Sequence, residues 1–170
     1  TGLFGDHLWS VRLGAVIFSA LLAVAAFRMT AVLRDRATAW LVAAAIYVNP
    51  LVMAAGLLEL TDIFYAALSL TALHEFLRAK ENPRHYIYAG ILCGLAINAK
   101  LLAAFWPPAL GLALIAARPE DLRRREVWIG GGLCALAALP VLGWNAAHGW
   151  ATFAIRFGYQ VEPRPTFSHL

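Results

Sequence analysis

The sequence contains little charge and little cysteine, and each shortage excludes a class of protein. Charged residues make up 14% of the 170 residues, whereas 61% are hydrophobic and the mean hydropathy is +0.67. Soluble domains have roughly 45–50% apolar residues, so this composition indicates an integral membrane protein. The two cysteines, Cys93 and Cys134, lie inside apolar runs, which favours small core side chains over a disulfide framework or a metal site.

Several sequence motifs of soluble enzymes are also missing. The chain has no catalytic-triad pattern, no phosphate-binding glycine loop and no zinc-ligand spacing. The adjacent Asp6 and His7 only faintly suggest a metal site, because neighbouring residues seldom bind one ion and no second pair of ligands is visible. The glycine run 130–132 lies inside an apolar stretch, where close helix packing is the expected role. The chain opens at Thr1 without a signal-peptide pattern and stops in a polar stretch, so we expect it to be part of a longer protein.

Long apolar runs predict the fold. About 20 apolar residues cross the hydrocarbon core of a bilayer as a helix, and shorter runs need their flanks to do so. The sequence therefore predicts an all-α fold, a polytopic transmembrane bundle in one domain over 1–170 with short loops. Its six predicted spans are residues 13–33, 37–58, 63–77, 86–99, 101–117 and 127–147.

Lysine and arginine are divided unevenly between the two ends of these spans. If the spans alternate in direction, 10 of the 14 basic residues fall on one side, and the other side holds four, Lys100 among them. Cytoplasmic loops carry the excess of Lys and Arg, so the richer side is predicted to be cytoplasmic. The net charge of +4 then reflects this bias rather than nucleic-acid binding, and Lys100 is predicted to lie at the outer face.

Lys100 interrupts an otherwise apolar stretch, "LAINAKLLAAFWPPALGLAL", residues 95–114. A charge at bilayer depth costs at least ~2.5–3.5 kcal/mol, so this lysine either reaches the interface or works in a covered site. Because the run before it is short and Pro107 and Pro108 follow, "INAK" is predicted to be an outer turn. An interfacial anchor and a functional cation both remain open for Lys100.

Other polar and aromatic residues are predicted at the same outer face. Asp62, after Thr61, has the position of a helix-capping acid as well as of a site residue. Trp144 suits an aromatic belt, and His148 suits a helix end. A multi-span transporter, a flippase or a packing module of a membrane complex is the alternative class. Transporters, however, place polar residues near the midplane, often in two related halves, and this sequence has no internal repeat.

Four stretches, in this order, carry a resemblance to a known family. They are "GLFGDHLWSVRLGAVIFSALLAVAAFRM", "YVNPLVMAAGLLELTDIF", "GILCGLAINAKLLAAFWPPALGLAL" and "LPVLGWNAAHGWATFAIRF". The chain resembles bacterial GT-C membrane glycosyltransferases of the glycosyltransferase family 39 type, the group of the protein O-mannosyltransferases and the lipid A aminoarabinose transferase. The resemblance implies a GT-C-like bundle in the bacterial inner (plasma) membrane with its active face outward.

The same resemblance implies an activity. A hexosyl or pentosyl group moves, with inversion, from a polyprenyl-phosphate donor to a lipid, glycan or protein acceptor. The family's general base lies in a first outer loop behind one more N-terminal span, and that acidic block is not among these residues. We expect that span and loop, together with a C-terminal remainder, to lie outside this chain, and we do not assign Asp6 as the base.

The resemblance also implies roles for individual residues. Lys100 is the expected cation for the departing lipid phosphate, since a fixed charge near developing charge lowers the barrier. Asp62, the one candidate catalytic residue in this chain, would orient an acceptor hydroxyl, bind a divalent metal or pair with Lys100, and these stay open. Asn145 and His148 would donate hydrogen bonds to sugar or phosphate oxygens, and Trp144 would stack on a sugar or prenyl chain. The neighbours Ile63 and Leu101 depart from the family pattern, so the sugar and acceptor are not assigned.

Overall fold

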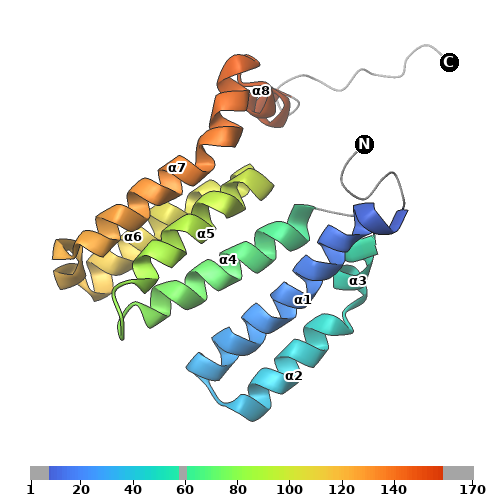
Figure 1. Ribbon diagram of the computed structural model, residues 1–170, viewed down its shortest axis with the longest axis horizontal. Coiled ribbons are helices and arrows are strands. Elements are labelled where there is room, and N and C mark those ends of the chain that lie inside the picture. The colour runs from blue at the N-terminus through green and yellow to red at the C-terminus, as the bar shows by residue number, and fades with distance from the viewer. Residues whose placement is uncertain (1–7, 58–60, 159–170) are drawn as a thin grey trace. The chain divides into compact units, whose positions relative to one another are not determined.

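The computed structural model describes residues 8–57 and 61–158, and within these ranges every regular element is a helix. The all-α prediction is therefore confirmed for this part of the chain, while Asp6, His7 and Glu59 lie outside it. Figure 1 labels the α-helices, and the 3₁₀ helices η1 and η2 come directly before and after α6 in the chain. Their bounds are α1 Leu8–Leu33, α2 Arg36–Tyr47, α3 Pro50–Leu57, α4 Thr61–Arg78, α5 His85–Ala99, η1 Leu101–Phe105, α6 Trp106–Ala117, η2 Pro119–Arg123, α7 Arg125–Ala147 and α8 Ala151–Gly158.

The chain divides into two compact units, residues 1–138 and 139–170, which are described separately. Among the described residues, two helices are long and apolar enough to cross a membrane, through Val16–Leu33 and through Arg125–Ala147. His85–Ala99 and Leu101–Ala117 are apolar but shorter, so the bundle of about six spans stays a prediction. Many large apolar side chains are exposed, Leu41 and Leu51 the most, as expected where hydrocarbon or another apolar surface replaces water.

The predicted span 37–58 is divided into two helices, α2 and α3, so its prediction as one continuous run is wrong. Helix α2 ends where the N–H of Val48 donates to the carbonyl of Ala44 at 2.9 Å. Pro50 has no N–H and disfavours a helical conformation in Asn49 before it, so the helix stops there. The side chain of Asn49 then accepts the N–H of Leu51 at 2.8 Å, which opens α3.

In the first unit, contacts between aromatic rings show which helices lie beside α1. Phe18 and Phe64 contact one another with ring centroids 4.5 Å apart, which places the first half of α1 beside the first half of α4. Phe27 of α1 contacts Trp40 of α2 at 4.8 Å, across a turn in which Asp35 accepts the backbone N–H of Thr38. That hydrogen bond and a second one from the Thr38 hydroxyl lower the pKa of Asp35.

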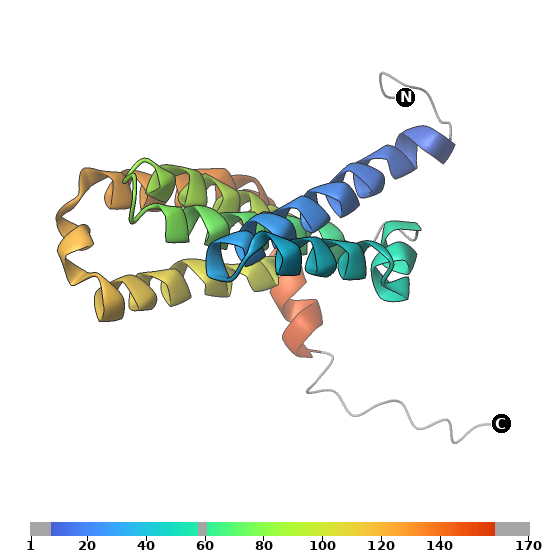
Figure 2. The ribbon, with the colours of Figure 1, turned by 90° about the horizontal axis from the view of Figure 1, so that it is seen from below.

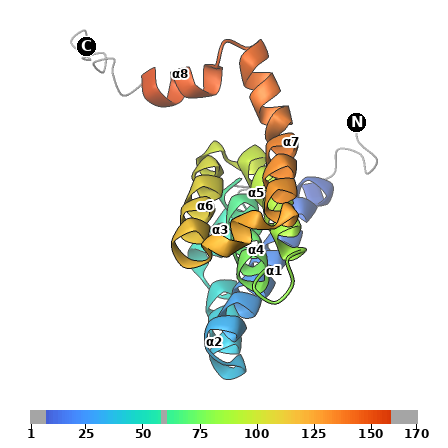
Figure 3. The same ribbon diagram turned by 90° about the vertical axis from the view of Figure 1, so that its left-hand side faces the viewer.

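Three arginine-bearing turns therefore gather at one end of this unit. Helices α4 and α5 form an antiparallel pair, and α1 runs parallel to α4, so the turn at residues 34–35 and the turn at residues 79–84 share an end (Figures 1 and 2). Tyr86, after the second turn, donates to Asp121 of η2 at 2.6 Å, which brings the third turn to the same end. Figure 3 views the ribbon from this side. The sequence assigned these three turns to a single face of the membrane.

Close packing of α5 on α7 depends on small residues. A side-chain carbon at Gly90 would collide with the carbonyl of Gly130, and one at Gly94 would lie 2.5 Å from the carbonyl oxygen of Cys134. The predicted packing role of the glycine run is thus confirmed for Gly130. Among the residues that the structure describes, nothing lies within 4 Å of the corresponding positions at Gly131 and Gly132. In this part of the chain, the contact between α5 and α7 therefore uses the first glycine of the run and not the other two.

Candidate functional site

Lys100 lies where α5 ends and the chain changes direction. Its N–H donates to the carbonyl of Ala96 at 2.9 Å, its backbone is extended (φ −155°, ψ 122°), and η1 begins at the next residue. Pro107 and Pro108 then occupy the first turn of α6, where proline's missing N–H costs nothing. The turn predicted at "INAK" therefore exists, and it removes Lys100 from any helix interior.

Asp62 lies at the same end of the antiparallel pair α4 and α5, in the first turn of α4. The ammonium of Lys100 donates to the carboxylate of Asp62, which confirms the pairing that the sequence left as one of three roles for this acid. The carboxylate lies at a helix N-terminus and the ammonium at a helix C-terminus, so both helix dipoles favour the pair.

The exposure of this pair bears on what it does. The Lys100 side chain is 26% exposed and that of Asp62 is 55% exposed. An exposed ion pair adds only about 0–1 kcal/mol to stability, so folding alone gives little reason for placing a lysine between apolar runs. Because the Lys100 and Asp62 side chains are both accessible, another charged group can reach them. The pair can therefore exchange its internal contact for one with an anion.

Asn98 links the Lys100 end of α5 to α7. Its amide nitrogen donates to the carbonyl of Ala137 at 2.5 Å and to that of Gly94, one turn back in its own helix, at 3.0 Å. The sequence placed Asn98 at the outer face without a partner in α7, because a single amide carries no signal of an interhelical bond. This bond lies two residues before Lys100 and holds the end of α5.

Asn145, His148 and Trp144 belong to the second unit, so the structure does not relate them to Lys100 and Asp62. Asn145 is fully buried; its amide nitrogen donates to the carbonyl of Val141 at 2.9 Å and its oxygen accepts the N–H of Thr152 at 3.2 Å. The His148 ring stacks on Trp144 at 4.3 Å, and its Nδ1 lies 2.7 Å from the Trp144 carbonyl. Both Asn145 and His148 have structural contacts, and their substrate roles stay predictions.

These contacts support a tight turn between α7 and α8. Gly149 has a φ of +61° and Trp150 a φ of +58°, the left-handed region that a bulky side chain rarely adopts. The N–H of Trp150 donates to the carbonyl of Asn145 at 2.7 Å. Asn145 thus makes hydrogen bonds on both sides of the turn, and the residues of the "WN…HGW" block have a local structural role in it.

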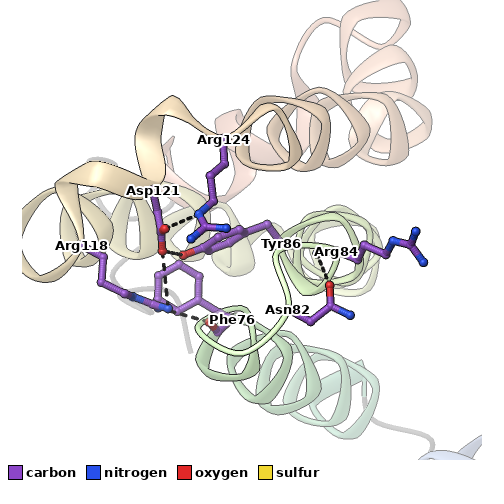
Figure 4. A network of polar contacts seen from close by, with 7 residues as sticks. All are labelled: Phe76, Asn82, Arg84, Tyr86, Arg118, Asp121 and Arg124. Atoms are coloured by element: carbon purple, nitrogen blue, oxygen red, sulfur yellow. Dashed lines mark hydrogen bonds and ion pairs between the residues drawn. The ribbon is translucent and has the colours of Figure 1, made fainter.

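A polar cluster at the arginine-bearing end was missed by the sequence reasoning. Asp121 is buried and accepts hydrogen bonds from Tyr86 at 2.6 Å and from Arg124 Nε at 2.5 Å, while Arg118 Nη1 lies 3.9 Å away (Figure 4). Burial alone would raise the pKa of Asp121, but these donors and charges outweigh it and leave the pKa below its ordinary value. The sequence pattern that could have indicated this cluster is an acid with Arg118 three residues before it and Arg124 three residues after it.

Two histidines and a glutamate lie near the same end. Glu75, within the apolar run of α4, pairs with Nδ1 of His85, and both side chains are 12% exposed. The buried His74 lies 4.0 Å from Glu75. Even so, no group of three or more His, Cys, Asp or Glu side chains with a geometry for a metal ion occurs among the described residues.

These features define a class of protein. The described residues form long apolar helices with exposed apolar side chains. Arginine-bearing turns lie at one end of the first unit, and an exposed lysine–carboxylate pair lies at the other. This combination is typical of a helical membrane protein with a polar site at its helix ends.

Comparison with known families narrows this class. Residues 1–144 match the family described as dolichyl-phosphate-mannose-protein mannosyltransferase, and the chain belongs to that family. Neither the curated proteins nor the solved structures gave a match. The resemblance identified from the sequence is confirmed: the family consists of membrane-embedded glycosyltransferases that use a polyprenyl-phosphate-linked sugar. Asp62, Lys100 and Trp144 lie inside the matched range, and Asn145 and His148 lie just beyond it.

Proposed function

We propose that this chain forms part of an enzyme that moves a sugar, with inversion, from a polyprenyl-phosphate donor to an acceptor at the outer face of a bacterial plasma membrane. The observation that carries the proposal is the Lys100–Asp62 pair. It lies at the end of α5 opposite the arginine-bearing turns, in a chain whose family uses a phosphate-linked donor. By the distribution of positive charge, that end of the helices faces outward.

The proposed chemistry uses Lys100 on the leaving group. The acceptor oxygen attacks the anomeric carbon from the face opposite the phosphate, the bond between that carbon and the phosphate oxygen breaks, and its electron pair stays on the lipid phosphate. The ammonium of Lys100 stabilises this growing negative charge. Asp62 positions the ammonium before the donor arrives. The proton of the acceptor hydroxyl goes to a general base, which we place outside these 170 residues.

Transfer of labelled sugar tests this function directly. We expect the complete gene product in membranes to transfer sugar from a polyprenyl-phosphate-linked donor, and residues 1–170 alone to transfer none, because the family's acidic block, which we propose carries the base, is not among them. Product formed by residues 1–170 alone would place the base within them and make Asp6 and Asp62 the first candidates. If the complete product transfers no sugar from such donors but moves the intact lipid across vesicles, the enzyme assignment is wrong and a flippase replaces it.

The proposed orientation predicts the result of reporter fusions. Reporters after Arg36, Asn82 and Arg124 should score cytoplasmic, because these positions lie in or beside the three basic turns. Reporters near Glu59 and His148 should score outside. An outward signal at Arg124 would contradict both the six predicted spans and the placement of Lys100.

A further inference from the structure

A groove opens at the arginine-bearing end of the first unit, between the end of α4, the end of α6 and η2. Its volume is about 690 Å³, and apolar side chains from two helices, Leu77 of α4 and Ala113 and Ala117 of α6, form one part of its lining. The other part is charged, with Lys80, Arg118 and Arg124 as cations and Glu120 and Asp121 as acids. A groove that combines apolar walls with three cations suits a ligand that is itself amphipathic.

Arg118 is the fixed cation of this groove. Its guanidinium lies over the Phe76 ring at 5.0 Å and near the Tyr86 ring at 5.7 Å, and its Nη2 donates to the carbonyl of Phe76 at 3.3 Å. Its other terminal nitrogen, Nη1, is buried and has no hydrogen-bond partner among the described residues. The closest carboxylate oxygen, on Asp121, is 3.9 Å from it. One half of the guanidinium fork is therefore held in place while the other half lacks an acceptor.

The remaining charges leave an excess of positive charge in the groove. Each oxygen of Asp121 already accepts one hydrogen bond, from Tyr86 or from Arg124, so part of its charge is offset within the cluster. The side chain of Lys80 is exposed, and no carboxylate in the part of the chain described here lies within ion-pair distance of it. Of the two acids in the lining, Glu120 is the one that accepts no side-chain hydrogen bond among the described residues. Its single negative charge is outnumbered by the positive charges of Lys80 and Arg118.

We propose that this groove binds the phosphate group of an anionic membrane lipid, with the Arg118 guanidinium and Lys80 on the phosphate and the lipid's glycerol and first methylenes along Leu77, Ala113 and Ala117. Arginine recognises phosphate by charge-assisted hydrogen bonds, and basic pockets beside membrane helices on the cytoplasmic side bind such headgroups. The apolar walls favour a lipid over soluble phosphate. The site is at the opposite end of the helices from Lys100 and is independent of the proposed sugar transfer.

Lipid retention by the complete gene product tests this proposal. The protein is reconstituted in nanodiscs containing phosphatidylglycerol and phosphatidylcholine, and the lipids retained after extraction are counted by native mass spectrometry. We expect preferential retention of phosphatidylglycerol. Arg118→Gln should lower that preference about tenfold or more, the size of a charge-assisted hydrogen bond to a charged group. Lys80→Gln should lower it about fivefold, as for one basic residue at a membrane surface.

The matched control is Arg125→Gln, which removes a cation from the first residue of α7, shortly after η2. Its side chain is 86% exposed and does not line the groove, so the preference should stay within about twofold of wild type, as for a screened surface charge. Because Arg118 also packs on Phe76, Lys80→Gln keeps the test decisive if Arg118→Gln folds poorly. Unchanged preference in Lys80→Gln, or an equal loss in Arg125→Gln, would overturn the site. Inorganic phosphate that displaces phosphatidylglycerol and stabilises the protein as well as the lipid does would overturn its assignment to a lipid.

Discussion

Lys100→Gln is expected to lower sugar transfer by the complete enzyme by roughly 10²–10³-fold, the loss seen when one electrostatic contact to developing charge is removed. Glutamine is shorter than lysine but keeps a polar end, and it removes the ammonium that pairs with Asp62. The remaining carboxylate is 55% exposed, so its solvation limits the effect on folding. Turnover in membranes at matched protein level is the measurement.

Arginine at position 100 separates a catalytic from an anchoring lysine. Lys100→Arg should keep part of the activity if the ammonium contacts the leaving phosphate, because a planar guanidinium does not reproduce a compact charge. An interfacial anchor would accept arginine without loss, since both side chains reach the headgroups. Arg34→Gln, at an exposed position in the turn after α1, is the control and should transfer sugar normally. Activity of Lys100→Gln within about twofold of wild type would show that the phosphate is held elsewhere, because a lost contact in the transition state costs far more.

Gly90→Ala is expected to destabilise the protein, although alanine favours a helix by about 1 kcal/mol over glycine. The new methyl group would collide with the carbonyl of Gly130, and backbone in α7 cannot move aside as a flexible side chain can. Overpacking of this kind costs about 1–3 kcal/mol, which corresponds to a Tm lower by roughly 2–12 °C in a chain of this size, less the part that the helix propensity of alanine offsets. Thermal unfolding in detergent, followed by size-exclusion chromatography, measures the shift. Because α5 ends at Lys100, sugar transfer should fall as well.

Gly131→Ala is the matched control for this packing. It adds the same methyl group one residue away from Gly130, at a position with no described atom within 4 Å, and it gains the helix propensity of alanine. Its Tm should equal or exceed that of the wild type. If Gly90→Ala and Gly131→Ala unfold at the same temperature, the close approach of α5 and α7 does not support the fold.

Much of the helical architecture could be predicted, because apolar runs and their interruptions are local in the sequence. The turn at "INAK", with an isolated lysine before Pro107 and Pro108, was located from residue order alone. The division at Asn49–Pro50 was missed, because the run 37–58 has no charge and the proline inside it was given no weight. The buried Asp121 was also missed: its arginine neighbours were interpreted only as markers of membrane orientation, and Tyr86, its third partner, is distant in sequence.

By itself, the sequence determined that this is a helical chain with the composition of a membrane protein, and the order of its motifs identified the family. The tertiary structure decided which polar groups meet. Lys100 and Asp62 are 38 residues apart, and they meet because α4 and α5 pack as an antiparallel pair that brings the start of one helix to the end of the other. Composition and spacing are properties of single helices. A pair across two helices depends on how those helices pack, and only the folded chain specifies the distance between the two groups.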